Sequence, residues 1–381
     1  MARPRLVRTL IGRCVSAYAT SPALRTLQRE KSAAIRRVTF ARPLVRYFHQ
    51  GDDPYSQLTA QIVPELSARY AIDLETHVVP APSASAAPEA ARLAAYAERD
   101  AALLARAHGL RMPLAAQISD GDQQALASGE RLRARLGHYL GATFYFEGEW
   151  YWGLDRLPYL EARLAPFRRQ SAVPIVAWKS EGLLPPAKSG TVIDFFASLR
   201  SPYTYLAAAR IYSLAERFGA SVRLRFVLPM VMRGLPVPWA KRLYIMRDTK
   251  REAERLAMPF GNIADPVGRG VERGLAVLHY ADARGKGAAF LQSFLSGAFS
   301  QAIDAATDAG LGHMASRAGL NSDDIKAALG DSSWREVAEK NRAALFALGL
   351  WGVPSFRIQN GPNFWGQDRL WAIEEALSLT A

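Results

Sequence analysis

The feature that most restricts the fold of this chain is an internal repeat. Three short blocks occur twice and in the same order: residues 44–58 (LVRYFHQGDDPYSQL) match 192–206 (VIDFFASLRSPYTYL), 96–100 (YAERD) match 244–248 (YIMRD), and 151–157 (YWGLDRL) match 364–370 (FWGQDRL). Self-similarity of this kind is typical of a duplicated architecture, so both halves are expected to fold alike.

Each half has the pattern of a strand, a helix and a second strand. In the second half, an apolar run from Val192 precedes residues of helical periodicity that stop at Gly219, and a strand follows over 222–227. The first half has the corresponding strand over 74–79, and this order predicts a right-handed parallel crossover. A helical insertion, a hairpin over 355–365 and a closing helix complete the pattern. We predict an α/β chain of two tandem thioredoxin-like domains, each with a helical insertion.

A proline-rich stretch over 166–189 joins the two halves and favours neither helix nor strand. We therefore expect four segments. They are a basic N-terminal extension (1–37), a first thioredoxin-like domain (38–165), a linker (166–189) and a second thioredoxin-like domain (190–381).

The basic charge is concentrated at the N-terminus. The chain of 381 residues has a net charge of +13, and residues 1–37 hold nine basic side chains against one acid, a local charge of +8. A charged tail argues against a dedicated nucleic-acid function of the folded body. The extension resembles an organelle transit peptide more than a secretory signal. A solvated or self-packed extension is favoured over a membrane-surface helix, and weak membrane contact through it is left open.

Cys14 is the single cysteine of the chain, so no intramolecular disulfide and no dithiol redox centre can form. This excludes a dithiol oxidoreductase. The lack of disulfides favours a cytoplasmic location. No apolar stretch is long enough to span a membrane. The six histidines lack metal-ligand spacing, so we expect no metal site.

Ser201 and Pro202 stand between a predicted strand and helix, as expected for a helix cap followed by its first residue. In a thioredoxin-like fold the same turn holds the reactive group, and a hydroxyl there can hydrogen-bond the sulfur of a bound thiol. A simple cap is the more common explanation of such a dipeptide.

The surrounding motifs change that balance, because they resemble those of the 2-hydroxychromene-2-carboxylate isomerases and kappa-class glutathione transferases. The similar segments are 195–206 (FFASLRSPYTYL), 238–248 (PWAKRLYIMRD), 349–356 (GLWGVPSF) and 364–370 (FWGQDRL). The resemblance covers the chain from about 191 to its end and implies a DsbA-like thioredoxin fold that binds glutathione.

The resemblance also implies the role of each matching residue. Ser201 contacts the glutathione sulfur, with Pro202 and Tyr203 opening the helix beside it. Val353 pairs its backbone with the cysteinyl part and precedes Pro354 through a cis peptide bond, while the γ-glutamyl end is held by Gln367 and Asp368. The segment 234–238 (GLPVP) departs from the family pattern, which leaves the substrate open.

The first half departs much further from the family. Asp53 occupies the serine position, and Gly141 or Ala142 stands where the cis-proline belongs. A carboxylate repels a thiolate, so this half is expected to be a degenerate, structural copy. Another ligand at its helix N-terminus is left open.

The resulting hypothesis is a glutathione-dependent isomerase or transferase that acts on a small electrophilic, aromatic compound. We expect a small-molecule substrate and no nucleic-acid partner, and the oligomeric state is left open. The alternative is a catalytically silent, tandem thioredoxin-like binding module, membrane-associated through its basic tail.

Overall fold

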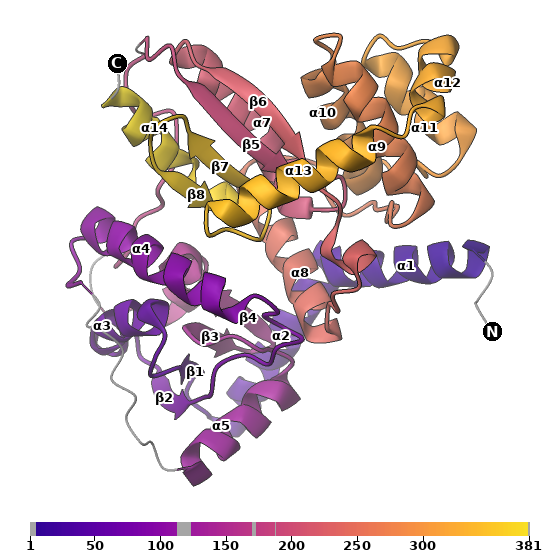
Figure 1. Ribbon diagram of the computed structural model, residues 1–381. Coiled ribbons are helices and arrows are strands. Elements are labelled where there is room, and N and C mark those ends of the chain that lie inside the picture. The colour runs from indigo at the N-terminus through magenta and orange to yellow at the C-terminus, as the bar shows by residue number, and fades with distance from the viewer. Residues whose placement is uncertain (1–4, 113–122, 170–172, 187, 380–381) are drawn as a thin grey trace. The chain divides into compact units, whose positions relative to one another are not determined.

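The computed structural model describes residues 5–112, 123–169, 173–186 and 188–379, and the side chains from Gly12 onward. The chain divides into two compact units (Figure 1). The N-terminal unit comprises Pro22–Trp178 together with Val237–Tyr244. The C-terminal unit comprises Met1–Ser21, Lys179–Pro236 and Ile245–Ala381. The main division therefore falls inside the proline-rich stretch over 166–189.

The N-terminal unit is built on a four-stranded sheet of order β2-β1-β3-β4. Its strands are β1 (Leu44–His49), β2 (Asp73–Val78), β3 (Thr143–Phe146) and β4 (Glu149–Trp152). β1 is parallel to β2 and antiparallel to β3, and β3 and β4 form a hairpin. Its helices are α2 (Pro22–Thr39), α3 (Pro54–Arg69), α4 (Ala90–His108), α5 (Gln123–Leu136) and α6 (Leu157–Leu164).

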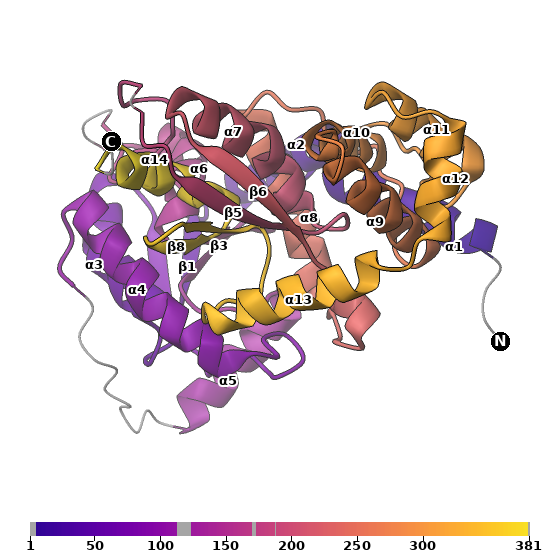
Figure 2. The same cartoon turned by 45° about the horizontal axis from the view of Figure 1, so that its top comes forward.

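The C-terminal unit has a second four-stranded sheet, of order β6-β5-β7-β8. Its strands are β5 (Val192–Ala197), β6 (Ser221–Phe226), β7 (Ser355–Ile358) and β8 (Asn363–Trp365). β5 is parallel to β6 and antiparallel to β7, so the strand directions match those of the first sheet. In Figure 2, α7 (Pro202–Arg217) lies along β5 and β6 with α14 (Leu370–Ser378) at its side.

A helical insertion separates β6 from β7 in the C-terminal unit. It comprises α8 (Trp239–Arg255), α9 (Arg269–Asp282), α10 (Gly287–Ser300), α11 (Asp308–Arg317), α12 (Ser322–Gly330) and α13 (Trp334–Ala347). α10 contacts α7, and α13 contacts β6. The shorter insertion of the N-terminal unit holds α4 and α5, and Pro113, expected near the end of its first helix, lies outside the described residues.

Local sequence explains why α7 forms where it does. Ser201 caps its first turn and Pro202 occupies the first helical position, where a missing N–H costs nothing. Leu206, Ile211 and Leu214 lie on successive turns of α7 and are buried. Gly219 follows the helix with φ 57°, a conformation that glycine adopts without strain.

The two sheets share their register as well as their order. Phe48 stands opposite Thr143 in the first sheet, and Phe196 stands opposite Ser355 at the matching positions of the second. Most side chains of β1 and β5 are apolar and buried, among them Val45, Phe48, Ile193 and Phe196. In the second sheet Phe195 stacks on Phe356, with ring centroids 5.2 Å apart.

A buried glutamate in the last helix of each unit binds the chain of the connecting stretch. Glu161 accepts hydrogen bonds from the backbone N–H of Ile175 at 3.1 and 3.0 Å. Glu374 accepts from the N–H of Gly182 at 3.0 and 2.9 Å. Both carboxylates are at most 3% exposed, so each fixes one end of the stretch to its own unit.

Val237–Tyr244, a segment that contains the first residues of α8, contributes to the core of the N-terminal unit. Tyr244 packs with Phe48, Val79 and Trp150 in one apolar cluster. Lys241 donates a 2.7 Å hydrogen bond from Nζ to the carbonyl of Ala86, and burial lowers the pKa of this amine to about 8.

His138 lies in the same cluster of the N-terminal unit. Its ring stacks on Trp150 with centroids 4.5 Å apart and meets Tyr244 edge-on at 4.6 Å. Burial lowers the pKa of His138 to about 3, so the ring is neutral near pH 7.

The N-terminal extension forms two helices that fall into different units. α1 (Arg5–Thr20) belongs to the C-terminal unit, where Thr20 Oγ1 lies 3.5 Å from the carbonyl of Gly261. α2 belongs to the N-terminal unit and none of its residues is buried. Among the described residues, no helix combines the length and apolarity needed to cross a bilayer.

Candidate active site

Ser201 lies at the junction of two hydrogen bonds. Its Oγ accepts from the backbone N–H of Thr204 at 3.1 Å, the capping bond predicted for it. The same hydroxyl donates to the carbonyl of Val353 at 3.3 Å. The side chain is half-buried, so the hydroxyl links the start of α7 to the loop before β7.

Pro354 follows Val353 through a cis peptide bond, as the resemblance implies. The carbonyl of Pro354 accepts a 3.0 Å bond from the N–H of Gly366, which fixes the loop against the end of β8. Ser201 is therefore a neighbour of Val353 and Pro354 in the structure, as the resemblance implies, although Ser201 and Val353 are 152 residues apart in sequence.

Tyr203 points its hydroxyl to the helical insertion. It donates a 2.8 Å bond to Oδ2 of Asp248, a carboxylate that is 1% exposed. Arg251, one turn further along α8, lies 3.7 Å from Oδ1 of the same aspartate. This contact joins the first turn of α7 to α8 beside Ser201.

Gln367 is 1% exposed, and both ends of its amide are engaged inside the protein. Nη1 of Arg210 donates to its Oε1 at 2.6 Å, and its Nε2 donates to Oε2 of Glu252 at 2.8 Å. Arg255 also donates to Oε2 of Glu252, at 3.0 Å. The side chain of Gln367 is thus used to hold α7, α8 and the turn after β8 together.

Arg210 also forms a two-pronged ion pair with Glu181, at 2.5 and 2.8 Å. Burial alone would raise the pKa of Glu181, but hydrogen bonds and charge from Arg210 hold it below its usual range. Sequence reasoning missed Arg210, Glu252 and Glu181, because no motif connects them. They lie on α7, α8 and the linker, which are far apart in sequence and meet only in the folded unit.

Asp368 follows Gln367 in the short helix Gln367–Arg369 and is half-buried. Nη1 of Arg369 lies 3.8 Å from its Oδ1. An acid in the first turn of this helix interacts favourably with the positive helix end, and it keeps part of its surface open to solvent.

In the N-terminal unit, the matching turn carries Asp53, whose carboxylate caps the start of α3. Asp53 Oδ2 accepts from the backbone N–H of Ser56 at 3.0 Å and from its Oγ at 2.8 Å. Burial raises the pKa of Asp53 to about 6. Ala142, at φ 52°, takes the position of Pro354, because its carbonyl accepts from Gly153 as that of Pro354 does from Gly366.

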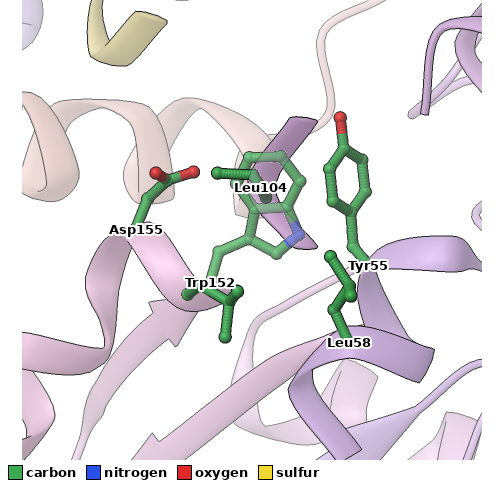
Figure 3. A pocket seen from close by; sticks show the side chains of 7 residues that line it. Tyr55, Leu58, Leu104, Trp152 and Asp155 are labelled. Atoms are coloured by element: carbon green, nitrogen blue, oxygen red, sulfur yellow. The ribbon is translucent and has the colours of Figure 1, made fainter. Parts of the chain in front are cut away.

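Where the C-terminal unit has its polar network, the N-terminal unit has a small apolar pocket. Figure 3 shows Tyr55, Leu104 and Trp152 around it, with Asp155 at its edge. Leu58, Gly153 and Leu154 complete the lining. Leu154 and Leu104 stand at the repeat positions of Gln367 and Glu252, so apolar packing replaces the hydrogen bonds of the other unit.

In the described part of the chain, no three His, Cys, Asp or Glu side chains come together in a way that could hold a metal ion. Cys14 is exposed on α1. The turn before α7 thus presents the hydroxyl of Ser201, and the turn before α3 presents the carboxylate of Asp53.

The fold and this turn define a thioredoxin-like unit without its redox cysteines. Residues 192–378 match the family model of the DSBA-like thioredoxin domain, and this half of the chain has that fold. The chain is similar to 2-hydroxychromene-2-carboxylate isomerase of Pseudomonas putida, at 22% identity over 191 residues that make up 49% of this chain and 94% of the isomerase.

Two solved structures are similar to about half of the chain. A structure of 2-hydroxychromene-2-carboxylate isomerase aligns with 49% of this chain and 95% of its own at 21% identity and a TM-score of 0.43. The cytosolic disulfide reductase DsbM from Pseudomonas aeruginosa aligns with 50% of this chain and all of its own at 21% identity and a TM-score of 0.41.

Proposed function

We propose that the C-terminal unit binds glutathione and uses its thiolate to isomerise or conjugate a small electrophilic, aromatic compound. The observation that carries this proposal is the position of Ser201. Its hydroxyl lies at the positive end of α7, faces the carbonyl of Val353 and stands in the turn where thioredoxin-like proteins place a reactive sulfur.

The chemistry follows from that position. On binding of the tripeptide, the hydroxyl of Ser201 transfers its hydrogen bond from the carbonyl of Val353 to the sulfur. The bond and the helix end both favour the thiolate, so the pKa of the bound thiol falls. The reactive sulfur arrives with the ligand, which explains why the turn needs no cysteine of its own.

Two reactions use the same thiolate. In the isomerase reaction the thiolate adds to an unsaturated carbon of the substrate, a bond rotates, and the thiolate is expelled unchanged. In the transferase reaction the carbon–sulfur bond persists and glutathione is consumed. The similarity to 2-hydroxychromene-2-carboxylate isomerase supports the first reaction and an aromatic substrate.

The remaining roles divide between direct contact and support. We assign the backbone of Val353 to the cysteinyl part of the tripeptide and the carboxylate of Asp368 to the γ-glutamyl ammonium group. Pro202 and Tyr203 hold the start of α7 in place, Tyr203 through its bond to Asp248. The amide of Gln367 is hydrogen-bonded to Arg210 and Glu252, and this fixes the position of the adjacent Asp368.

We further propose that the two units are tandem copies, and that the first has lost the thiol site. The shared strand order and register support this, as do equivalent contacts. Tyr55 bonds to Asp100 as Tyr203 bonds to Asp248, at 2.8 Å in both cases. A carboxylate at Asp53 disfavours a thiolate, so the first copy serves the fold.

Titration calorimetry with glutathione, followed by spectrophotometric screening of chromene carboxylates, enones and halonitroarenes with and without glutathione, tests the proposal. We expect binding by the full chain and turnover only with glutathione, in keeping with a cytoplasmic enzyme. Absence of glutathione binding overturns the proposal. Binding without turnover of any compound class favours the silent binding module instead.

A further inference from the structure

The amphipathic helix α2 is oriented opposite to the usual arrangement, with its polar side against the protein. Arg29 holds both oxygens of Glu149, at 2.6 and 2.8 Å. Arg36 pairs with Glu147 and lies over the ring of Phe167, 4.9 Å from its centroid. These contacts attach α2 to its own unit through charged side chains.

The apolar side chains of α2 face solvent. Leu24, Leu27, Ile35 and Val38 are 42%, 61%, 54% and 79% exposed. They fall on one face of the helix, because their spacings of three, eight and three residues are close to whole turns. Phe40, directly after the helix, is 93% exposed. Soluble helices normally bury such a stripe, so this face is built to meet another surface.

Cationic side chains accompany the apolar face. Arg29 and Arg36 are neutralised by Glu149 and Glu147, while Lys31 and Arg37 are exposed to solvent. α2 itself has five basic side chains and one acid, Glu30, a net charge of +4. The partner that fits an exposed apolar stripe with basic side chains is an anionic lipid surface, whose charge complements them.

We propose that α2 binds the surface of an anionic lipid bilayer, with Leu24, Leu27, Ile35, Val38 and Phe40 inserted among the acyl chains. The helix lies in the plane of the interface, since none of the described helices is apolar enough to cross it. The ion pairs of Arg29 and Arg36 hold the rest of the N-terminal unit against the side of α2 that faces away from the bilayer. The inference is independent of the glutathione proposal.

Lys31 distinguishes this partner from a second copy of the chain. It lies seven residues from Leu24 and from Val38, in the middle of the apolar stripe. In a helix–helix seam between two copies, two ammonium groups would be buried close together without a counter-charge. At a bilayer surface the long side chain reaches up to the phosphates while its methylenes cover the acyl boundary.

Co-sedimentation of the full chain with vesicles tests the inference, using phosphatidylcholine alone and phosphatidylcholine mixed with phosphatidylglycerol. We expect binding to the mixed vesicles that weakens as salt rises. The triple variant Leu27→Glu, Ile35→Glu, Val38→Glu should bind at least about tenfold more weakly, and Lys31→Gln roughly fivefold more weakly.

A matched control carries the same change of charge on exposed apolar residues elsewhere, Val173→Glu, Leu329→Glu and Leu379→Glu. It should retain far more binding than the α2 triple variant. Circular dichroism verifies that both triple variants are folded. Equal loss in both triple variants, or no binding of the wild type to anionic vesicles, overturns the inference. So does unchanged vesicle binding by the α2 variant together with a lower mass in analytical ultracentrifugation, which would assign the face to self-association.

Discussion

The hydroxyl of Tyr203 donates a 2.8 Å hydrogen bond to Asp248, a buried carboxylate 45 residues further along the chain. Tyr55 and Asp100 form the same contact at the same distance and the same separation in sequence. In both units the bond joins the first turn of the helix after the central strand to the first long helix of the insertion. In the C-terminal unit this hydrogen bond therefore holds the first helix of the insertion, α8, beside the turn that contains Ser201.

Tyr203→Phe is expected to destabilise the protein by about 1.5–3 kcal/mol, because it removes a neutral donor from a buried carboxylate. Urea denaturation measures the change. Tyr18→Phe is the control, since Tyr18 is 63% exposed, and it should stay within about 0.5 kcal/mol of wild type. Equal stability of the two variants would show that Asp248 does not depend on this bond.

Ser201→Ala should raise the pKa of enzyme-bound glutathione and slow turnover roughly tenfold to a hundredfold, since a charge-assisted bond to the thiolate contributes about 1.5–3 kcal/mol. Folding should suffer less, by about 1 kcal/mol for the lost cap. Titration of the thiolate absorbance in the ultraviolet gives the pKa directly.

Asp53→Ala is the matched variant in the other unit, since Asp53 also caps its helix. It should leave glutathione binding unchanged. An unaltered thiol pKa in Ser201→Ala would reduce Ser201 to a helix cap, and loss of binding in Asp53→Ala alone would assign the site to the other unit.

Gln367→Leu should cost about 2–4 kcal/mol, because it removes the acceptor of one Arg210 N–H and the donor to Glu252. The double variant Glu252→Leu, Gln367→Leu introduces the leucines found at the matching positions of the N-terminal unit, Leu104 and Leu154, and leaves the ion pair of Arg210 with Glu181 intact. It should be more stable than Gln367→Leu alone, as measured by urea denaturation, because it also removes the buried carboxylate that has lost a donor. A double variant less stable than the single one would show that Gln367 and Glu252 do not act as a pair.

The pH dependence of stability should carry a contribution from Asp53. Its pKa is about 6 in the folded protein, above that of an unfolded aspartate, so stability is lost as pH rises from about 4 through 6. Asp53→Asn removes this loss and keeps the cap, so its stability relative to wild type should increase by about 2 kcal/mol between pH 4 and pH 8. Leu329→Ala, at an exposed side chain that carries no titratable group, should follow the wild-type pH profile in urea denaturation.

Local patterns predicted the strands and the capped helix at Ser201, because strand periodicity and cap residues act over short distances. That Ser201 lies beside Val353 was expected only from the family resemblance, since the two residues are 152 positions apart. The strands over 222–227 and 74–79 were each placed one residue too late. The hydrogen bonds of the Gln367 side chain could not be predicted, since its partners Arg210 and Glu252 come from other helices. The equal spacing of Tyr55 to Asp100 and Tyr203 to Asp248 was a usable signal that was missed.

The assignment of residues 237–244 to the N-terminal unit affects how the protein can be taken apart. Lys241 and Tyr244 belong by sequence to the second repeat but pack against Ala86 and His138 of the first. A cut in the proline-rich stretch therefore leaves the first unit without part of its core. We expect that neither repeat can be expressed alone in its native form, and that a protease acting between residues 173 and 189 nicks the chain without releasing a fragment.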